Sequence, residues 1–365
     1  MITISLCMIV KNEEKVLARC LDSIRSAVEE IIIVDTGSTD RTKEIAARYT
    51  KQIYDFAWQD DFSAARNESF SKAKMDYLLW LDADDVIESE QLQALIRLKE
   101  ELSPQVQTVM MQYHTAFDED GRAVFRYYRE RLVRRDSHPV WKGRVHEAID
   151  YSGPVLYSDI VISHRSVKTS YSDRNLKIYE RQLREEQTLS PRDTFYYGRE
   201  LYYHRRYEQA AETLEQFLRS DGGWVENKIE ACKILSYCYG ELGLEQHEFS
   251  ALTRSFLYGD PRAEICCEIG NYLMQAASYS GAVFWFKLAR SIPHHDKSGS
   301  FVSDDCYGYL PCIQLCVCYD RLGDYTLSEE YNRLAGTYRP HSPAYLQNLK
   351  YFEQRAAHIE RQDGI

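Results

Sequence analysis

The sequence lacks several features that mark common classes of protein. No hydrophobic run is long enough to span a membrane, and the N-terminus has no basic leader or small-residue cleavage site. No glycine-rich phosphate loop occurs before Gly37, which disfavours a kinase or a nucleotidyltransferase. A basic excess is also missing, since the net charge is -11. A nucleic-acid partner, which needs a basic face, is therefore not expected.

Cysteine is not scarce, but its pattern argues against disulfides and against a metal site. Eight of the ten cysteines lie from Cys232 onward, in a chain of 365 residues that is long enough for two ordinary domains without disulfides. Cys312, Cys316 and Cys318 have no CxxC pair beside them. We expect reduced thiols buried at helix interfaces, and a cytoplasmic location.

The hydrophobic pattern divides the chain into two predicted domains, residues 1–172 and 173–365. The first alternates short apolar runs with helical segments, the pattern of an α/β domain with a mostly parallel sheet. A helix is expected after the first strand, with Asn12 as its N-cap. The expected strands are residues 2–10, 30–34, 52–54, 77–81 and 106–113.

The second half has helical periodicity and a weak internal repeat. Four aligned positions, Tyr207, Leu244, Tyr279 and Tyr325, recur at spacings near the roughly 34 residues of a tetratricopeptide repeat, the last one wider. The pattern predicts an all-α array of stacked helix pairs, with an irregular helical bundle as the alternative. Tyrosine-rich repeats could equally support a homodimer.

The most informative local pattern is an apolar run, residues 77–81, that ends in the carboxylates Asp82, Asp84 and Asp85. Ligands of open α/β sheets bind outside the carboxyl ends of the strands. Crowded carboxylates attract hard cations such as Mg²⁺ or Mn²⁺, which also bridge phosphates. The pattern predicts a metal and diphosphate site, and the alternative is a solvated acidic turn before a helix.

Three polar motifs precede the acidic triplet. Lys11-Asn12-Glu13 follows the first expected strand, and Asp35 ends the second, before a glycine-containing turn. Asp35 could accept hydrogen bonds from a base or a ribose. Further along the chain, Arg66 could reach a diphosphate. Any one of these motifs could instead be an ordinary helix cap.

Together, and in this order, the motifs resemble family 2 glycosyltransferases, which are inverting enzymes of the GT-A fold. The resemblance covers roughly the first half of the chain and implies a UDP-sugar as the donor. It implies Mg²⁺ or Mn²⁺ held by Asp82, Asp84 and His164, and leaves the role of Asp85 open. The residues that it places at the nucleotide sugar are Asn12, Glu13, Asp35, Ser38, Arg66, Asp82 and Ala83.

A second polar cluster, residues 139–147, ends in His146 and Glu147. Inverting transfer needs one base, opposite the departing diphosphate, to take the acceptor's proton. Glu147 or His146 could supply it, and the alternative is a surface His-Glu pair beside a packed Trp141. The arginine-rich stretch before this cluster, residues 122–135, could neutralise phosphate or could form a solvated hairpin face.

In this chain, the half that resembles family 2 is followed by residues 195–201 and the helical repeats. In this combination the chain resembles a narrower group, glycosyltransferases with a C-terminal tetratricopeptide-like domain. That group includes the peptide S- and O-glycosyltransferases of glycocin bacteriocins of the sublancin type. The likeness implies transfer to a Ser/Thr hydroxyl or a Cys thiol of a peptide or protein recognised with the repeats. Two alternatives are a transferase of surface polysaccharide or lipid-linked glycan synthesis, and a non-catalytic scaffold that binds a protein partner.

Overall fold

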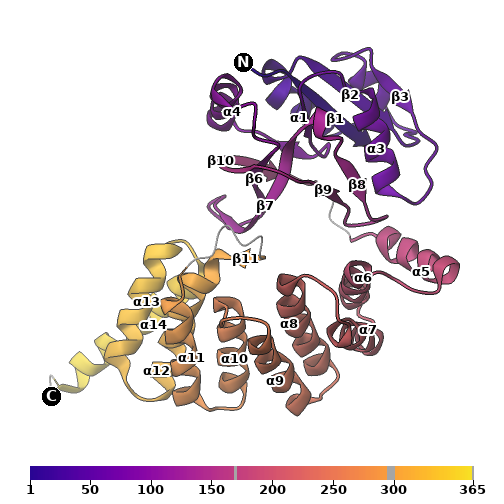
Figure 1. Ribbon diagram of the computed structural model, residues 1–365. Helices are drawn as coiled ribbons and strands as arrows, with labels where there is room; N and C mark the ends of the chain where they lie inside the picture. The colour runs from indigo at the N-terminus through magenta and orange to yellow at the C-terminus, as the bar shows by residue number, and fades with distance from the viewer. Residues whose placement is uncertain (168–170, 294–300, 364–365) are drawn as a thin grey trace. The chain divides into compact units, whose positions relative to one another are not determined.

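The computed structural model describes residues 1–167, 171–293 and 301–363 of the chain (Figure 1). Its internal contacts divide the chain into two compact units. The first unit consists of Met1–Thr115 and Arg126–Glu200, and the second of Ala116–Phe125 and Leu201–Ile365. Among the described residues, the structure has no helix that is both long enough and apolar enough to cross a bilayer.

The first unit is built on a mostly parallel sheet whose strands lie in the order β3-β2-β1-β4-β7-β6-β10-β5. Strands β1 to β4 run parallel to one another, as do β6 and β10, whereas β7 runs antiparallel to β4, and β5 to β10. Strands β8 and β9 form a separate antiparallel pair. The strands are β1 (Ile4–Val10), β2 (Glu30–Asp35), β3 (Ile53–Asp55), β4 (Tyr77–Trp80), β5 (Asp85–Val86), β6 (Thr108–Phe117), β7 (Ala123–Arg134), β8 (Val140–Lys142), β9 (Ala148–Asp150) and β10 (Val155–His164).

Helices cover both faces of the sheet, as the alternation of side chains along β1 requires (Figure 1). Leu6 and Met8 pack on one face in a core that includes Leu21 and Leu95, whereas Cys7 packs on the other face in a core that includes Phe70. The predicted α/β class is confirmed. The helices that supply these contacts are α1 (Leu17–Ile24), α2 (Thr42–Ala46) and α4 (Ser89–Glu101) on the first face and α3 (Phe62–Lys72) on the second.

Helices α5 (Arg174–Glu186) and α6 (Pro191–Tyr203) begin the helical part of the chain, yet α5 and most of α6 belong to the first unit. Arg144 forms ion pairs of 2.9 Å with Glu185 and with Glu186 of α5. Glu200 of α6 lies 2.9 Å from His146. These contacts connect both helices to the first unit, whose second segment ends at Glu200.

The second unit is an array of helix pairs (Figure 1). The four positions aligned in the sequence fall where the second helix of each pair begins: Tyr207, Tyr279 and Tyr325 are first residues, and Leu244 is an N-cap. The predicted tetratricopeptide-like array is therefore confirmed. Its helices are α7 (Tyr207–Arg219), α8 (Val225–Glu241), α9 (Glu245–Arg254), α10 (Ala263–Gln275), α11 (Tyr279–Ser291), α12 (Tyr309–Arg321), α13 (Tyr325–Tyr338) and α14 (Pro343–Asp363), with a short strand β11 (Val302–Ser303) before α12.

Small residues let neighbouring helices of this array approach closely. A Cβ atom added to Gly270 of α10 would lie 2.6 Å from the ring of Phe286 in α11. Cys266 and Cys267 of α10 and Cys318 of α12 belong to the same buried cluster. All ten cysteines are buried, and Cys312, Cys316 and Cys318 are buried in helix α12, as predicted for small residues at helix interfaces.

The tip of the hairpin formed by β6 and β7, residues 116–125, belongs to the second unit. Arg339 pairs with Asp305 at 2.9 Å and also with Glu119 of this hairpin tip. His341 lies 2.8 Å from Asp120. The second unit is therefore made from two separate parts of the chain.

Candidate active site

The carboxyl ends of three parallel strands bring the polar motifs together. In the sheet Val10, at the end of β1, pairs with Asp35, at the end of β2, and β1 also pairs with β4, which precedes Asp82. Parallel strands place these ends at one edge of the sheet, where α/β proteins bind their ligands. The sequence motifs thus share a site because of the strand order.

Asp35 is held by the turn that follows it. Its Oδ1 atom accepts hydrogen bonds from the amides of Gly37, at 2.9 Å, and Ser38, at 2.8 Å. Gly37 has a φ of 103°, which favours glycine. The other oxygen of Asp35, Oδ2, is buried and has no hydrogen-bond partner in the described part of the chain. A buried carboxylate oxygen without a donor is costly, so this atom is suited to a ligand hydroxyl or N–H group.

Asn12 and Glu13 connect the first strand to this turn. The Asn12 amide donates to Ser38 Oγ at 2.9 Å, and Asn12 Oδ1 accepts from the Thr39 amide at 2.8 Å. The Glu13 amide donates to Thr42 Oγ1 at 2.7 Å. The prediction that Asn12 caps the first helix is wrong, because α1 begins only at Leu17. Asn12 has a φ of 55° and holds the turn after β2 instead.

Arg66 joins two carboxylates that are far apart in sequence. Its Nη2 atom lies 2.8 Å from Asp82 Oδ1, and its Nε atom lies 2.5 Å from Glu147 Oε1. The guanidinium carbon is 4.8 Å from the ring centroid of Trp80 and 4.9 Å from that of Trp141, and the side chain is only 8% exposed. The two rings pack against each other, with centroids 5.0 Å apart, and together with the acids at the donor edges of Arg66 they fix the orientation of this cation.

The charge of Asp82 is stabilised by its neighbours. Burial by itself raises the pKa of the Asp82 carboxyl, but the positive charges of Arg66 and Arg131 outweigh it and hold this pKa well below the usual range. The carboxylate keeps 35% of its surface exposed. Asp82 is therefore an anion with one oxygen bonded to Arg66 and part of its surface open to a ligand. Its neighbour Ala83 is buried.

Asp85 lies at the centre of a fully buried network. Its Oδ2 atom accepts from Arg131 at 3.0 Å and from the Asp82 amide at 3.0 Å, and its Oδ1 atom accepts from the Tyr113 hydroxyl at 2.9 Å. The Arg131 guanidinium lies between Trp80 and Tyr113, 3.8 Å and 4.2 Å from their ring centroids. This network fixes the conformation of the acidic turn.

Asp84, Asp85 and His164 could together hold a cation, because their ligand atoms lie within 4.8 Å of one another. His164 Nδ1 is 3.4 Å from Asp84 Oδ1, and 3.4 Å from Asp85 Oδ1. Burial lowers the pKa of His164, but the hydrogen bond to Asp85 and the nearby carboxylates raise it overall. Of the ligands implied by the sequence, Asp84 and His164 come together here, whereas the carboxylate of Asp82 is paired with Arg66.

His146 occupies a different environment from Glu147. The imidazole Nε2 atom lies 2.9 Å from Glu200, Nδ1 lies 3.4 Å from Arg199, and the ring stacks on Tyr196 with centroids 4.4 Å apart. Burial and the charge of Arg199 lower the pKa of His146, although Glu200 opposes them. Both ring nitrogens thus face protein groups, whereas Glu147 is bonded to Arg66 beside Asp82.

Sequence reasoning missed the partners that hold these groups. Arg131 was one of several arginines expected on a hairpin, either at a phosphate or in solvent, but it is fully buried against Asp85. Glu200 was noticed only as part of a motif, yet its carboxylate accepts from Tyr171 at 2.7 Å and contacts His146. The one signal in the sequence was the presence of charged residues inside helix and strand segments that are otherwise apolar. Charged residues at such positions are buried only when they are paired with a partner.

Comparison with known proteins supports this assembly of motifs. Residues 5–151 match the family model described as glycosyl transferase family 2. The SPbeta prophage-derived glycosyltransferase SunS of Bacillus subtilis is 27% identical over 241 residues, which are 60% of this chain and 54% of that protein. A TPR repeat-containing protein of Synechococcus elongatus is 48% identical over 85 residues, or 23% of this chain and 21% of that protein. The chain spans about a fifth of the latter relative and about half of the former.

Solved structures were also compared with the chain. The TPR protein YrrB, described as having an unusual peptide-binding site, superimposes with a TM-score of 0.38 and 15% identity over 49% of this chain and 83% of that one. A score this low supports no conclusion about function.

Proposed function

The chain carries a family 2 glycosyltransferase domain, and from this premise we propose that it is an inverting, metal-dependent glycosyltransferase. It would move a sugar from a UDP-sugar to a Ser/Thr hydroxyl or a Cys thiol of a peptide or protein. The observation that carries the proposal is Arg66, which bonds to Asp82 and to Glu147 at the carboxyl edge of the sheet. Ten buried, unpaired cysteines support a reducing compartment such as the cytoplasm.

The donor would bind over the turn after β2. Asp35 Oδ2 is buried without a partner and would accept from the base or ribose. Asn12, Glu13 and Ser38 would keep that turn in place through their hydrogen bonds across it. The open part of Asp82 would contact the ribose or the sugar, while Arg66 would stabilise the charge of the leaving diphosphate.

The residues present fit a divalent cation. Within the described residues, the Asp84 carboxylate makes one polar contact, with His164, so its oxygens are available to a cation. An imidazole with carboxylates suits Mn²⁺, and carboxylates alone suit Mg²⁺. A cation there would neutralise charge on the diphosphate. Asp84 and His164 would hold it, and Asp85 would keep both in position through Tyr113 and Arg131.

Glu147 is better placed than His146 to act as the base. It lies beside Asp82 through their common partner Arg66, and only its Oε1 atom is used in that pair. In the reaction the bond between the anomeric carbon and the diphosphate oxygen would break. A bond from the acceptor oxygen or sulfur would form, and the acceptor proton would pass to Glu147. His146, bonded to Glu200, would anchor the loop that carries Glu147.

The direct test is hydrolysis of UDP-glucose and UDP-N-acetylglucosamine by the purified chain with Mn²⁺, with Mg²⁺ and with EDTA. Release of UDP that depends on the cation would support the proposal. Absence of hydrolysis and of donor binding would favour the scaffold alternative, and full activity in EDTA would contradict the role of the metal. Mass spectrometry of a peptide encoded next to this chain and co-expressed with it would then identify the acceptor and the linkage.

A further inference from the structure

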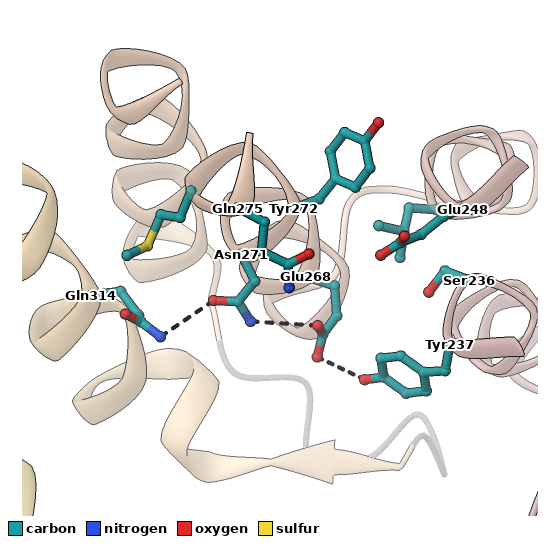
Figure 2. Close-up of a pocket in the computed structure, with 10 residues that line it drawn as sticks. Ser236, Tyr237, Glu248, Glu268, Asn271, Tyr272, Gln275 and Gln314 are labelled. Carbon is teal, nitrogen blue, oxygen red and sulfur yellow. Dashed lines mark hydrogen bonds between the residues drawn. The ribbon is translucent and has the colours of Figure 1, made fainter. Parts of the chain in front are cut away.

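The second unit contains a pocket of about 410 Å³ that the proposed chemistry does not use. It is formed by residues of α8, α9, α10 and α12 (Figure 2). Helices α8, α10 and α12 are the first helices of three consecutive pairs, so a ligand here would contact three repeats. The volume is within the range of about 300–1,000 Å³ that is usual for ligand sites.

A chain of hydrogen bonds connects four residues of the pocket lining, as the dashed lines in Figure 2 show. Gln314 of α12 donates to Asn271 Oδ1 at 3.3 Å, and Asn271 Nδ2 donates to Glu268 Oε2 at 3.4 Å. The Tyr237 hydroxyl of α8 donates to Glu268 Oε1 at 2.7 Å. Tyr237 and Asn271 thus hold the Glu268 carboxylate in place, and Gln314 in turn holds Asn271, with lone pairs of the carboxylate left for a further donor.

Glu248 of α9 adds a second carboxylate to the lining. Within the described residues, its carboxylate has no hydrogen-bond or ion-pair partner. Burial and the negative charges of Glu245 and Glu268 raise its pKa. The lining includes no lysine or arginine, and Lys233, which lies near Glu268, is paired with Glu230 at 2.7 Å. Two carboxylates in one pocket without their own cation favour a positively charged ligand.

The remaining lining residues narrow the class of ligand further. Asn271, Gln275 and Gln314 present amide groups, which both donate and accept, as the main chain of a peptide does. Tyr237 and Tyr272 offer rings that can pack against an aliphatic stem or a cation. Phosphate or carboxylate ligands would be repelled by the two glutamates.

We propose that this pocket binds a lysine or arginine side chain of a polypeptide, with its ammonium or guanidinium group between Glu248 and Glu268 and its main chain on the amide side chains. The identification of that polypeptide as the acceptor rests on the proposed function. The pocket would then select acceptors that carry a basic residue at a fixed distance from the glycosylated one.

The experiment measures binding of Ac-Gly-Ala-Lys-Ala-Gly-NH2 to the full chain by ligand-observed NMR titration, without nucleotide sugar. The matched peptide carries norleucine in place of lysine. We expect the lysine peptide to bind with a Kd lower by about tenfold or more. In the double variant Glu248→Gln/Glu268→Gln this preference should disappear. Equal binding of the two peptides by the unmodified chain would overturn the proposal.

The control double variant is Glu212→Gln/Glu241→Gln, which removes the same charge from exposed positions outside the pocket lining. It should keep the lysine preference, and a loss as large as in the pocket variant would show that net charge alone is responsible and would refute the pocket. Free n-butylamine distinguishes a polypeptide from a simple amine. If it binds as tightly as the lysine peptide, the amide contacts contribute nothing and the polypeptide assignment is wrong.

Failure of this inference can be told apart from failure of the proposed function. The titration contains no UDP-sugar or metal, so an inactive sheet unit would not change it. Hydrolysis of UDP-glucose by the unmodified chain, without peptide, tests the transferase alone. A chain that hydrolyses the donor but does not prefer the lysine peptide would refute only the pocket.

Discussion

Two acidic regions of this molecule carry carboxylates in opposite settings. In the sheet unit, Asp82 and Asp85 each bond to a buried arginine, Arg66 and Arg131. In the helical unit, Glu248 and Glu268 line a pocket that includes no cationic side chain. Carboxylates that are already paired with arginines suit an anionic ligand, because the arginines can also interact with it. Carboxylates that have no cationic partner suit a cationic ligand.

Asp84→Asn tests the sheet region and should have the largest effect. The substitution keeps the shape of the side chain but removes the charge, so we expect the rate of UDP-glucose hydrolysis with Mn²⁺ to fall roughly 100- to 1,000-fold. Asp159→Asn is the control, because that aspartate is exposed on β10. If both variants lose the same activity, or if neither loses any, Asp84 does not bind the cation as proposed.

Arg66→Ala tests whether the sheet region depends on its internal cation. Asp82 and the buried Glu147 would face each other without compensation, and breaking a buried pair in this way costs about 3 kcal/mol of unfolding free energy. Urea denaturation followed by circular dichroism measures the loss. Arg181→Ala, which removes an exposed arginine paired with Asp60 and Glu185, should cost less than about 1 kcal/mol. A similar loss of unfolding free energy in the two variants would show that the buried arginine is no more important for stability than the exposed one.

Gly270→Ala sharpens the description of the helical region. The added methyl group would meet the Phe286 ring at 2.6 Å and push α10, which carries Glu268 and Asn271, away from α11. Overpacking of this kind costs about 2 kcal/mol, and the lysine-peptide affinity should fall with it. Gly259→Ala, whose methyl would lie 3.7 Å from Ile229, should change stability by less than about 0.5 kcal/mol. An unaltered urea midpoint in Gly270→Ala would show that the contact between α10 and α11 can accommodate the methyl group without loss of stability.

The smallest expected effect is the contribution of His146 to the pH dependence of stability. Its pKa is lowered in the folded chain, so near pH 6 the unfolded chain binds more protons than the folded one at this residue. The stability that comes from a neutral His146 is therefore present above pH 6.5 and declines as the pH falls. We expect His146→Gln to show a smaller loss of urea midpoint between pH 7.5 and pH 5.5 than the unmodified chain. An identical loss would contradict the assigned environment.

The regular parts of the fold were predictable because their signals are local. The expected strands at residues 2–10, 30–34 and 77–81 correspond to β1, β2 and β4, and the repeat alignment located the start of α11 at Tyr279. Such signals depend on side-chain periodicity within a few turns or a few residues. The carboxyl ends of parallel strands then meet at one edge, which is why the main polar motifs could be grouped in advance.

The partners inside the site were not predictable, because each lies far along the chain. Arg66 and Glu147 are 81 positions apart, and Arg131 is 46 positions from Asp85. Nothing in the local pattern distinguishes Arg131 from the exposed arginines of the same hairpin. The strand order between β4 and β7 brings it under Trp80. The pocket was equally hidden, since it needs side chains from three separate repeats.

The hairpin tip at residues 116–125 limits how the protein can fold during synthesis and where it can be divided. This segment is synthesised before the last part of the first unit, but its ion pairs can form only after Arg339 and His341 have been synthesised. A segment of the second unit is therefore synthesised between the two segments of the first unit. A single cut near residue 200 would yield one fragment carrying a segment of the other, so neither half would be a whole folding unit.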